Sequence, residues 1–220
     1  MTSAAVQVRA IRGMADIDEG LAALAIADPR LSRVIEAAGP VPLRLSEPGF
    51  SGLASIIVSQ MVSRASADAI WGRITAAGPV TAATYLAHEP DIVARFGLSR
   101  AKASTLLSLA AAIEAGHFDL DAIPTLEAKQ ALQLMTALPG IGPWTAEVYL
   151  MFCGGHADLF PVGDVALQAA VAHAFGLAER PAPRALAEMA QGWQPWRAVA
   201  ARLFWAYYGA CMRRNVTPIA

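Results

Sequence analysis

The stretch Leu138-Pro-Gly-Ile-Gly-Pro-Trp-Thr-Ala-Glu147 decides the fold of this 220-residue chain. Two glycines flank one apolar residue, Ile141, and glycine permits the positive φ that a tight turn needs. Pro143 follows at a position that suits the first residue of a helix. Apolar residues at helical spacing precede the turn, and Thr125 is placed to cap that earlier helix. The sequence therefore predicts a helix, a short hairpin and a second helix.

The predicted hairpin is suited to binding an anion. Its backbone N–H groups face outward and the following helix presents its positive end, which together suit a phosphate oxygen. Gly140, Gly142 and Thr145 are the candidates for binding a nucleic-acid backbone. Ile141 is expected to pack inward between the two helices. The alternative is that the turn only links two packed helices, which a short glycine-rich match does not exclude.

The rest of the chain predicts an all-α protein. Apolar residues make up 55% of it, helix formers dominate and β-branched runs are scarce. Ser99 is a good N-cap for a helix that runs through Ala115. Further helices are expected from Phe50 to Gly78 in one or two pieces, over 85–96 with a break near Pro90, over 165–175 before Gly176, and from Pro195-Trp196 through Tyr208.

Charge and cysteine content limit the function classes. The net charge of -1 argues against nucleic-acid binding by long-range attraction, but not against binding through a few well-placed amides. Cys153 and Cys211 are the two cysteines, too few for a four-thiolate cluster. They fit a reducing compartment, and no apolar stretch resembles an export signal or a membrane span. We therefore expect a cytoplasmic, monomeric protein that does not bind membranes.

Asp164 is the candidate catalytic carboxylate. It lies 22 positions beyond Gly142, after Pro161-Val-Gly163, and immediately before an apolar helical pattern. The N-terminus of a helix favours the ionised form of a carboxyl group. The alternative is that this aspartate only stabilises the start of its helix.

Together these features resemble the helix-hairpin-helix DNA glycosylase superfamily. Leu138 to Glu147 and Phe160-Pro-Val-Gly-Asp164 carry the resemblance. Ser59-Gln-Met-Val-Ser63, Gly97-Leu-Ser-Arg-Ala-Lys102 and Trp193-Gln-Pro-Trp-Arg197 with Trp205 are similar to the alkylation-repair branch, 3-methyladenine DNA glycosylase II. The resemblance implies one glycosylase domain with two helical lobes, about 50–137 and about 1–49 plus 138–220. The active-site cleft would lie between the lobes.

The resemblance also assigns roles to residues. Asp164 would stabilise the positive charge that develops on the sugar or position a water. Bifunctional members, which also cut the strand, carry a lysine in the helix after the hairpin, where this chain has Pro143-Trp144-Thr145. We therefore expect a monofunctional enzyme. Trp144 and Trp205 match positions of the base pocket, where an aromatic face attracts a cationic alkylated base.

The remaining implied features concern the DNA and ions. Gln60 and Met61 match the loop that enters the duplex, with Met61 as a wedge or, equally open, an ordinary core residue. Backbone carbonyls are placed to hold Na⁺ or K⁺ beside a phosphate, those of Thr136, Leu138 and Ile141. No iron–sulfur cluster or other cofactor is expected.

The expected partner is double-stranded DNA that contains alkylated bases. The expected reaction is release of 3-methyladenine or 7-methylguanine from a flipped nucleotide in base excision repair. Two alternatives stay open: a noncatalytic protein that binds DNA structures, and a glycosylase for mismatched or deaminated bases. Trp144 argues against a version for oxidised guanine, because those members of the superfamily generally carry the hairpin lysine.

Overall fold

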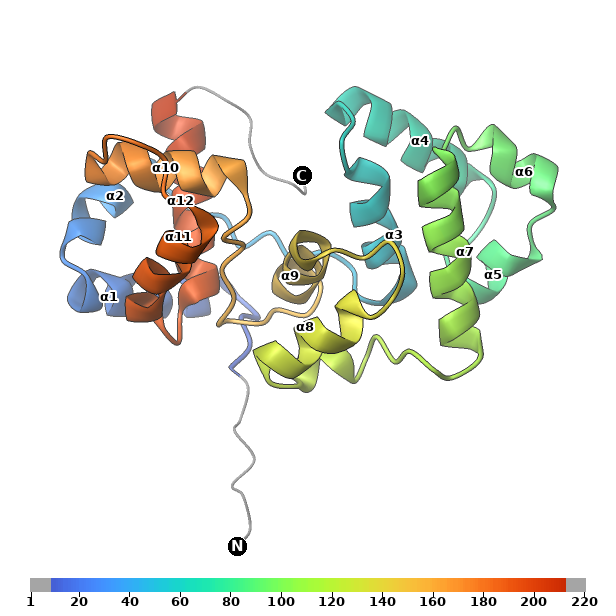
Figure 1. The fold of residues 1–220 in the computed structure, drawn as a ribbon, viewed down its shortest axis with the longest axis horizontal. Coiled ribbons are helices and arrows are strands. Elements are labelled where there is room, and N and C mark those ends of the chain that lie inside the picture. Colours follow the sequence, from blue (N-terminus) through green and yellow to red (C-terminus); the bar gives the residue numbers. More distant parts are fainter. Residues whose placement is uncertain (1–8, 213–220) are drawn as a thin grey trace, which may run out of the picture. The chain divides into compact units, whose positions relative to one another are not determined.

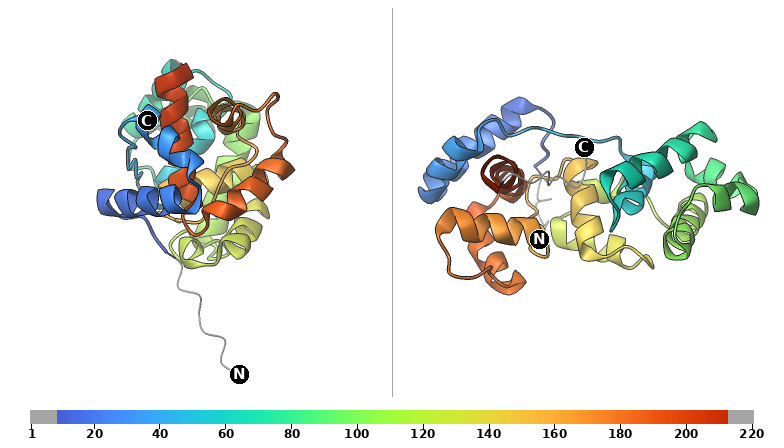
Figure 2. Two further views of the ribbon diagram at one scale, coloured as in Figure 1. Left: turned by 90° about the vertical axis from the view of Figure 1, so that its left-hand side faces the viewer. Right: turned by 90° about the horizontal axis from the view of Figure 1, so that it is seen from above.

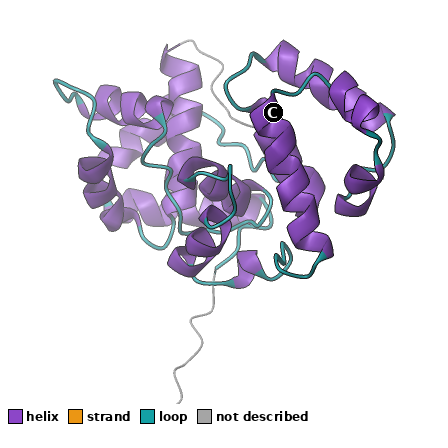
Figure 3. Ribbon diagram, turned by 45° about the vertical axis from the view of Figure 1, so that its right-hand side comes forward, coloured by secondary structure: helices purple, strands orange, loops and turns teal. Residues whose placement is uncertain are grey.

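A computed structural model describes residues 9–212, and every regular element in this range is a helix (Figure 3). The one β-type contact there is an isolated bridge between Ala10 and His156. The all-α prediction is confirmed. No helix in this range combines the length and the apolar character needed to span a bilayer. The described residues form two compact units, a middle unit (46–154) and a terminal unit (9–45 with 155–212).

The middle unit is built around one central helix, α3. This helix packs against α4, α7 and α9, and α5 packs against α7 (Figure 1). The elements are α3 (Gly49–Ser59), α4 (Arg64–Ala76), α5 (Ala82–Ala87), α6 (Pro90–Arg95), α7 (Arg100–Glu114), the 3-10 helix η1 (Ile123–Thr125), α8 (Ala128–Thr136) and α9 (Pro143–Phe152).

Helix caps in this unit follow the sequence in one case and depart from it in another. Ser99 caps α7 as predicted, because its side chain accepts a hydrogen bond from the Lys102 N–H at 3.3 Å. The prediction that Thr125 caps α8 is wrong. Thr125 ends η1 and its hydroxyl donates to the Ala122 carbonyl, whereas the Glu127 side chain accepts from the Lys129 N–H and caps α8.

The core of the middle unit contains a tyrosine hydroxyl that finds no hydrogen-bond partner among residues 9–212. Tyr85 packs between Phe50 and Phe96, with ring centroids 5.7 and 6.5 Å away. Burial raises the pKa of Tyr85 to about 12. An unsatisfied buried hydroxyl costs free energy, since it loses its hydrogen bonds to water.

We therefore expect Tyr85→Phe to stabilise the protein. The free energy of unfolding should rise by about 1 kcal/mol, because the substitution removes a desolvated hydroxyl and keeps the ring. Urea denaturation measures this change. Tyr149→Phe is the matched control: its hydroxyl accepts from the Gly49 N–H at 3.0 Å and lies 3.5 Å from the Leu120 carbonyl, so the same change should destabilise. Equal losses from both substitutions would contradict the expectation.

The terminal unit is organised around α12, which lies between the α1–α2 pair and the α10–α11 pair (Figure 2). Aromatic rings line this helix, with Trp193 5.3 Å from Phe204 and 5.2 Å from Phe160. The tryptophan side chain is 1% exposed, as expected of a core residue. The elements are α1 (Met14–Ala27), α2 (Arg30–Ala38), α10 (Val165–Phe175), α11 (Pro183–Ala190), the 3-10 helix η2 (Gln191–Trp193) and α12 (Arg197–Met212).

The division of the chain differs from the predicted lobes, which placed 138–220 with 1–49. Helix α9 packs on α3 and α8, so the hairpin and α9 belong to the middle unit. Residues 9–45 instead contact residues 155–212. The Ile11 N–H donates to the Gly155 carbonyl, and the buried Arg202 side chain donates to the Leu43 carbonyl at 3.2 Å.

Candidate active site

The hairpin is a tight turn between α8 and α9. The Ile141 N–H donates to the Leu138 carbonyl at 3.1 Å, and Gly140 has φ +88°. Ile141 is 4% exposed, which confirms the predicted inward packing. Gly142 is the N-cap of α9 and supplies no side chain to its first turn. The N–H groups of that turn therefore present the positive end of a ten-residue helix, as an anion site requires.

The two hairpin glycines differ in how closely other residues approach them. A Cβ on Gly140 would overlap the Thr105 side chain of α7, with Thr105 Cγ2 only 2.8 Å away. Nothing lies within 4 Å of the corresponding position at Gly142, whose φ is -85°. Gly140 is thus required by close approach as well as by backbone conformation, whereas Gly142 leaves space in front of α9.

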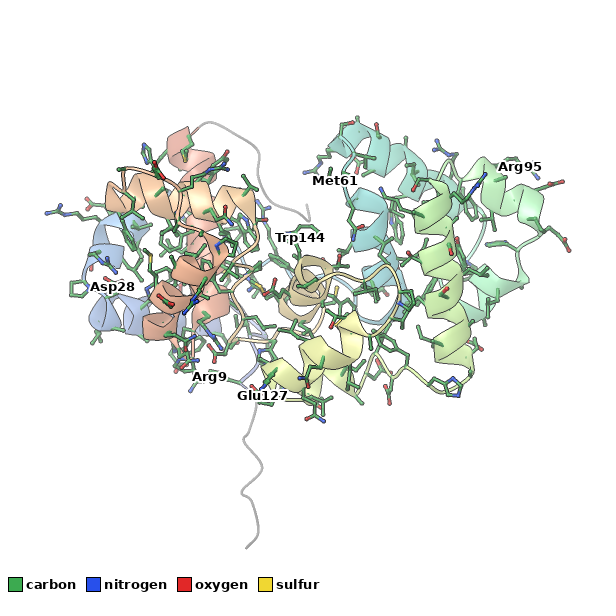
Figure 4. All side chains as sticks on the ribbon, in the orientation of Figure 1. Arg9, Asp28, Met61, Arg95, Glu127 and Trp144 are labelled. Atoms are coloured by element: carbon green, nitrogen blue, oxygen red, sulfur yellow. The ribbon has the colours of Figure 1, made fainter. Side chains whose placement is uncertain are left out.

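The α3–α4 loop contains the two predicted wedge residues. Gln60 Nε2 donates to Thr145 Oγ1 at 2.7 Å, so this loop is bonded to the first turn of α9. Thr145 is 4% exposed, which means that its hydroxyl is occupied inside the unit. Met61 has φ +55° and a side chain that is fully exposed, at the position labelled in Figure 4. The alternative in which Met61 is a core residue is therefore wrong.

Trp144 occupies the first turn of α9 and is half-buried (Figure 4). The resemblance described above implies a lysine at this position in bifunctional members. The Trp144 indole cannot form a Schiff base, because that reaction needs a primary amine.

Asp164 is held in place by the terminal unit. It is the N-cap of α10, and its Oδ1 accepts from the Leu167 N–H at 2.9 Å and lies 3.4 Å from Trp205 Nε1. The preceding turn is closed by a bond from the Asp164 N–H to the Pro161 carbonyl. Gln168, one turn along α10, donates to the Val162 carbonyl at 2.9 Å. The carboxylate is therefore oriented by both the helix start and an indole.

More than half of the chain matches a known family. Residues 54–196 match the HhH-GPD superfamily of base excision DNA repair proteins. The chain belongs to this superfamily.

Curated relatives of this HhH-GPD chain include proteins longer than it. It is 26% identical to YfjP of Bacillus subtilis over 184 residues, which are 80% of the chain and 64% of YfjP. It is 34% identical over 193 residues to the "Probable bifunctional transcriptional activator/DNA repair enzyme AlkA" of Mycobacterium tuberculosis, which are 81% of the chain and 37% of that protein. The chain thus spans less than two thirds of the length of either relative.

Solved structures agree with the HhH-GPD fold. The DNA-3-methyladenine glycosidase of Bacillus halodurans superposes with a TM-score of 0.79 at 28% identity, covering 91% of this chain and 93% of that one. The 3-methyladenine DNA glycosylase Mag1 of Schizosaccharomyces pombe, solved with abasic DNA, has a TM-score of 0.77 at 22% identity. Coverage there is 90% of this chain and 99% of that one, and this likeness concerns the fold alone.

In this HhH-GPD protein the predicted site residues fall into two groups. Asp164 and Trp205 come together in the terminal unit, and Trp205 is 3% exposed with its indole N–H facing the carboxylate. The other predicted side chains lie in the middle unit. Two residues with structural roles near the sites were not predicted from the sequence. Gln168 could have been indicated by its spacing of i+4 from Asp164. Lys102 has no local signal beyond the motif in which it lies.

The two thiols and a hollow in the middle unit contain none of the predicted site residues. Cys153 lies in the middle unit, where burial raises its pKa to about 12, and Cys211 lies in the terminal unit. Among residues 9–212 no three His, Cys, Asp or Glu side chains gather as metal ligands would. A hollow of about 570 Å³ lies at the start of α3 and the end of α7. Its carboxylates, which would repel phosphate, are Glu47, Glu114, Asp119 and Asp121.

Proposed function

We propose that this HhH-GPD protein is a monofunctional DNA glycosylase that hydrolyses the N-glycosidic bond of alkylated purines in duplex DNA. The observation that carries the proposal is the Asp164 carboxylate, oriented by the Leu167 and Trp205 N–H groups at the start of α10. The likeness to the Bacillus halodurans DNA-3-methyladenine glycosidase, at 28% identity over most of both chains, supports 3-methyladenine as a substrate. We propose 7-methylguanine as a second substrate, because alkylation at N7 also makes the base cationic.

The hairpin supplies the grip on the DNA in this proposal. The first N–H groups of α9 bind a phosphate oxygen, and the helix dipole favours the negative charge. Neutral amide donors explain how a chain with a net charge of -1 holds a polyanion. In this proposal the backbone carbonyls of Thr136, Leu138 and Ile141 would hold a monovalent cation next to that phosphate. The Leu138 oxygen already accepts from Ile141, and a carbonyl retains a second lone pair.

The chemistry assigned to Asp164 is electrostatic. As the bond between the base nitrogen and C1′ breaks, its electron pair leaves with the base and positive charge develops on the sugar. The ionised carboxylate stabilises that charge, and a water then adds to C1′ and loses a proton. Alkylation makes the base cationic, so the base leaves as a neutral molecule and needs no strong general acid. Trp144 offers the cation an aromatic face, an attraction worth about 0.5 to 2 kcal/mol.

The test is to incubate the protein with methylated duplex DNA and identify the released bases by chromatography. Release of 3-methyladenine or 7-methylguanine is the expected result. Release of uracil or thymine from mismatched duplexes, without alkylated bases, would assign the protein to the mismatch alternative. Tight binding of methylated duplex with no base released would assign it to the noncatalytic alternative.

We expect no covalent adduct when the reaction is run with borohydride, because a monofunctional enzyme forms no Schiff base. The chain has only two lysines, Lys102 and Lys129. Lys102 Nζ donates to two backbone carbonyls, and Lys129 is exposed on α8. Gel electrophoresis of labelled DNA measures trapping. A trapped adduct that disappears in a Lys102→Met or Lys129→Met variant would contradict monofunctionality and name the amine.

A further inference from the structure

Lys102 joins two elements that the sequence places far apart. It lies in the first turn of α7, and its ammonium group donates to the Val58 carbonyl at 2.7 Å and the Gln60 carbonyl at 2.6 Å. These two carbonyls belong to the C-terminal end of α3 and the residue after it. A cation there complements the negative end of the α3 dipole and holds carbonyls that the helix leaves unbonded.

The same loop is bonded from its other side. The Gln60 side chain donates to Thr145 Oγ1 at 2.7 Å, and Thr145 is buried in the first turn of α9. Gln60 is therefore held through its backbone by α7 and through its side chain by α9. The contacts connect the loop with the helix that follows the phosphate-binding hairpin.

The residue between these anchors and α4 is strained and exposed. Met61 has φ +55°, a conformation that is strained for a non-glycine residue and persists only where its surroundings hold it. The Met61 side chain is fully exposed. Ser63 begins α4 by accepting from the Ser66 N–H at 3.2 Å. The loop is thus fixed at both ends and presents Met61 outward, with the less exposed Val62 beside it.

We propose that Lys102 is a positioning residue, which holds the Gln60 backbone so that Met61 projects into the duplex when a base is extruded. The proposal rests on the proposed function, because a wedge is needed only if a nucleotide leaves the stack. Lys102 does not touch the reacting atoms. It acts through the loop and keeps the wedge in register with the hairpin.

The experiment compares Lys102→Met, which keeps the length of the side chain and removes its donors, with Lys102→Arg, which restores donors. Lys129→Met is the control, since it removes the other lysine from an exposed position. Each protein is given 7-methylguanine paired with cytosine and 7-methylguanine opposite an abasic-site analogue, where no pairing has to be broken. The readout is the ratio of kcat/KM on the paired substrate to that on the unpaired one.

Lys102→Met is expected to lower this ratio roughly tenfold, since wedging contributes only where extrusion has to be driven. Lys102→Arg should recover part of the loss, and Lys129→Met should leave the ratio unchanged. Equal losses on both substrates would overturn the proposal, because a merely structural or catalytic role weakens both. An unchanged ratio in Lys102→Met would overturn it as well. Circular dichroism melting identifies a variant that fails to fold. If Lys102→Met does not fold, the kcat/KM ratio of Lys102→Arg decides between these outcomes.

A second measurement separates this proposal from the proposed function. A duplex with 2-aminopurine next to an abasic-site analogue needs no bond cleavage, and its fluorescence rises when the neighbouring base unstacks. Wild type and Lys129→Met should raise the fluorescence, and Lys102→Met should not. If the wild type releases no alkylated base but still produces this difference, the proposed function fails and the role of Lys102 stands. If the fluorescence responds equally in all three proteins, the role of Lys102 fails.

Discussion

Asp164→Asn is expected to reduce the rate of base release by about 10²- to 10³-fold. The reason is charge: an amide has almost the same shape and still accepts the Leu167 N–H bond, but it cannot stabilise a positive sugar. Binding of duplex DNA should persist, because the hairpin lies in the other unit. Single-turnover kinetics on methylated duplex, together with binding to a duplex that holds an abasic-site analogue, measure the two effects separately.

Asp164→Ala distinguishes this role from simple helix capping. Asparagine is as good an N-cap as aspartate, whereas alanine loses about 1 kcal/mol of stability at such a position. If Asp164 only starts α10, then Asp164→Asn should resemble the wild type and Asp164→Ala should be impaired. If it is catalytic, both variants lose base release and only Asp164→Ala melts earlier. Wild-type rates in Asp164→Asn would remove Asp164 from the mechanism.

Gly140→Ala should impair both folding and DNA binding. A non-glycine residue at φ +88° costs about 1–3 kcal/mol, and the new methyl group would also overlap Thr105. The hairpin has to move away from α7 to relieve the overlap, which displaces the first N–H groups of α9. We expect a lower urea midpoint and at least a roughly tenfold weaker affinity for duplex DNA, since a change of 1.4 kcal/mol is already tenfold.

Gly142→Ala is the matched control for this prediction. Its φ of -85° suits any residue and nothing lies within 4 Å, so stability should fall by less than about 1 kcal/mol, the ordinary cost of alanine at an N-cap. A second control is Gly140→Ala combined with Thr105→Ala, which removes Oγ1 and Cγ2 and leaves the backbone strain together with the 2.9 Å approach to Cβ of residue 105. Partial recovery is expected. Equal stability of the two single glycine variants would contradict the close approach to α7.

Local signals predicted much of this fold from the sequence. The Ser99 cap, the start of α9 at Gly142-Pro143 and the end of α10 at Gly176 all depend on one or two residues whose backbone preferences are strong. Asp164 at the start of α10 was predicted in the same way. Such features are encoded within a few residues, so a single sequence is enough to identify them.

Features that depend on distant contacts were not predicted. The boundary after residue 154 reflects packing of α9 on α3, which no periodicity in the sequence specifies. Lys102 was noticed as part of a motif, but its bonds to Val58 and Gln60 join residues more than 40 positions apart. Thr125 and Glu127 are both acceptable N-caps for α8. Thr125 is part of the short η1 helix, so Glu127 caps α8.

The terminal unit is assembled from two separated stretches of chain, and this affects how the protein can be made. During synthesis residues 9–45 leave the ribosome well before α12, yet α1 and α2 pack on α12. The middle unit is contiguous and can fold as soon as residue 154 has left the exit tunnel, because domains fold as units while the chain grows. The apolar faces of α1 and α2 therefore wait, uncovered, through translation of more than a hundred residues. Apolar surface that stays uncovered in this way favours aggregation of a nascent chain.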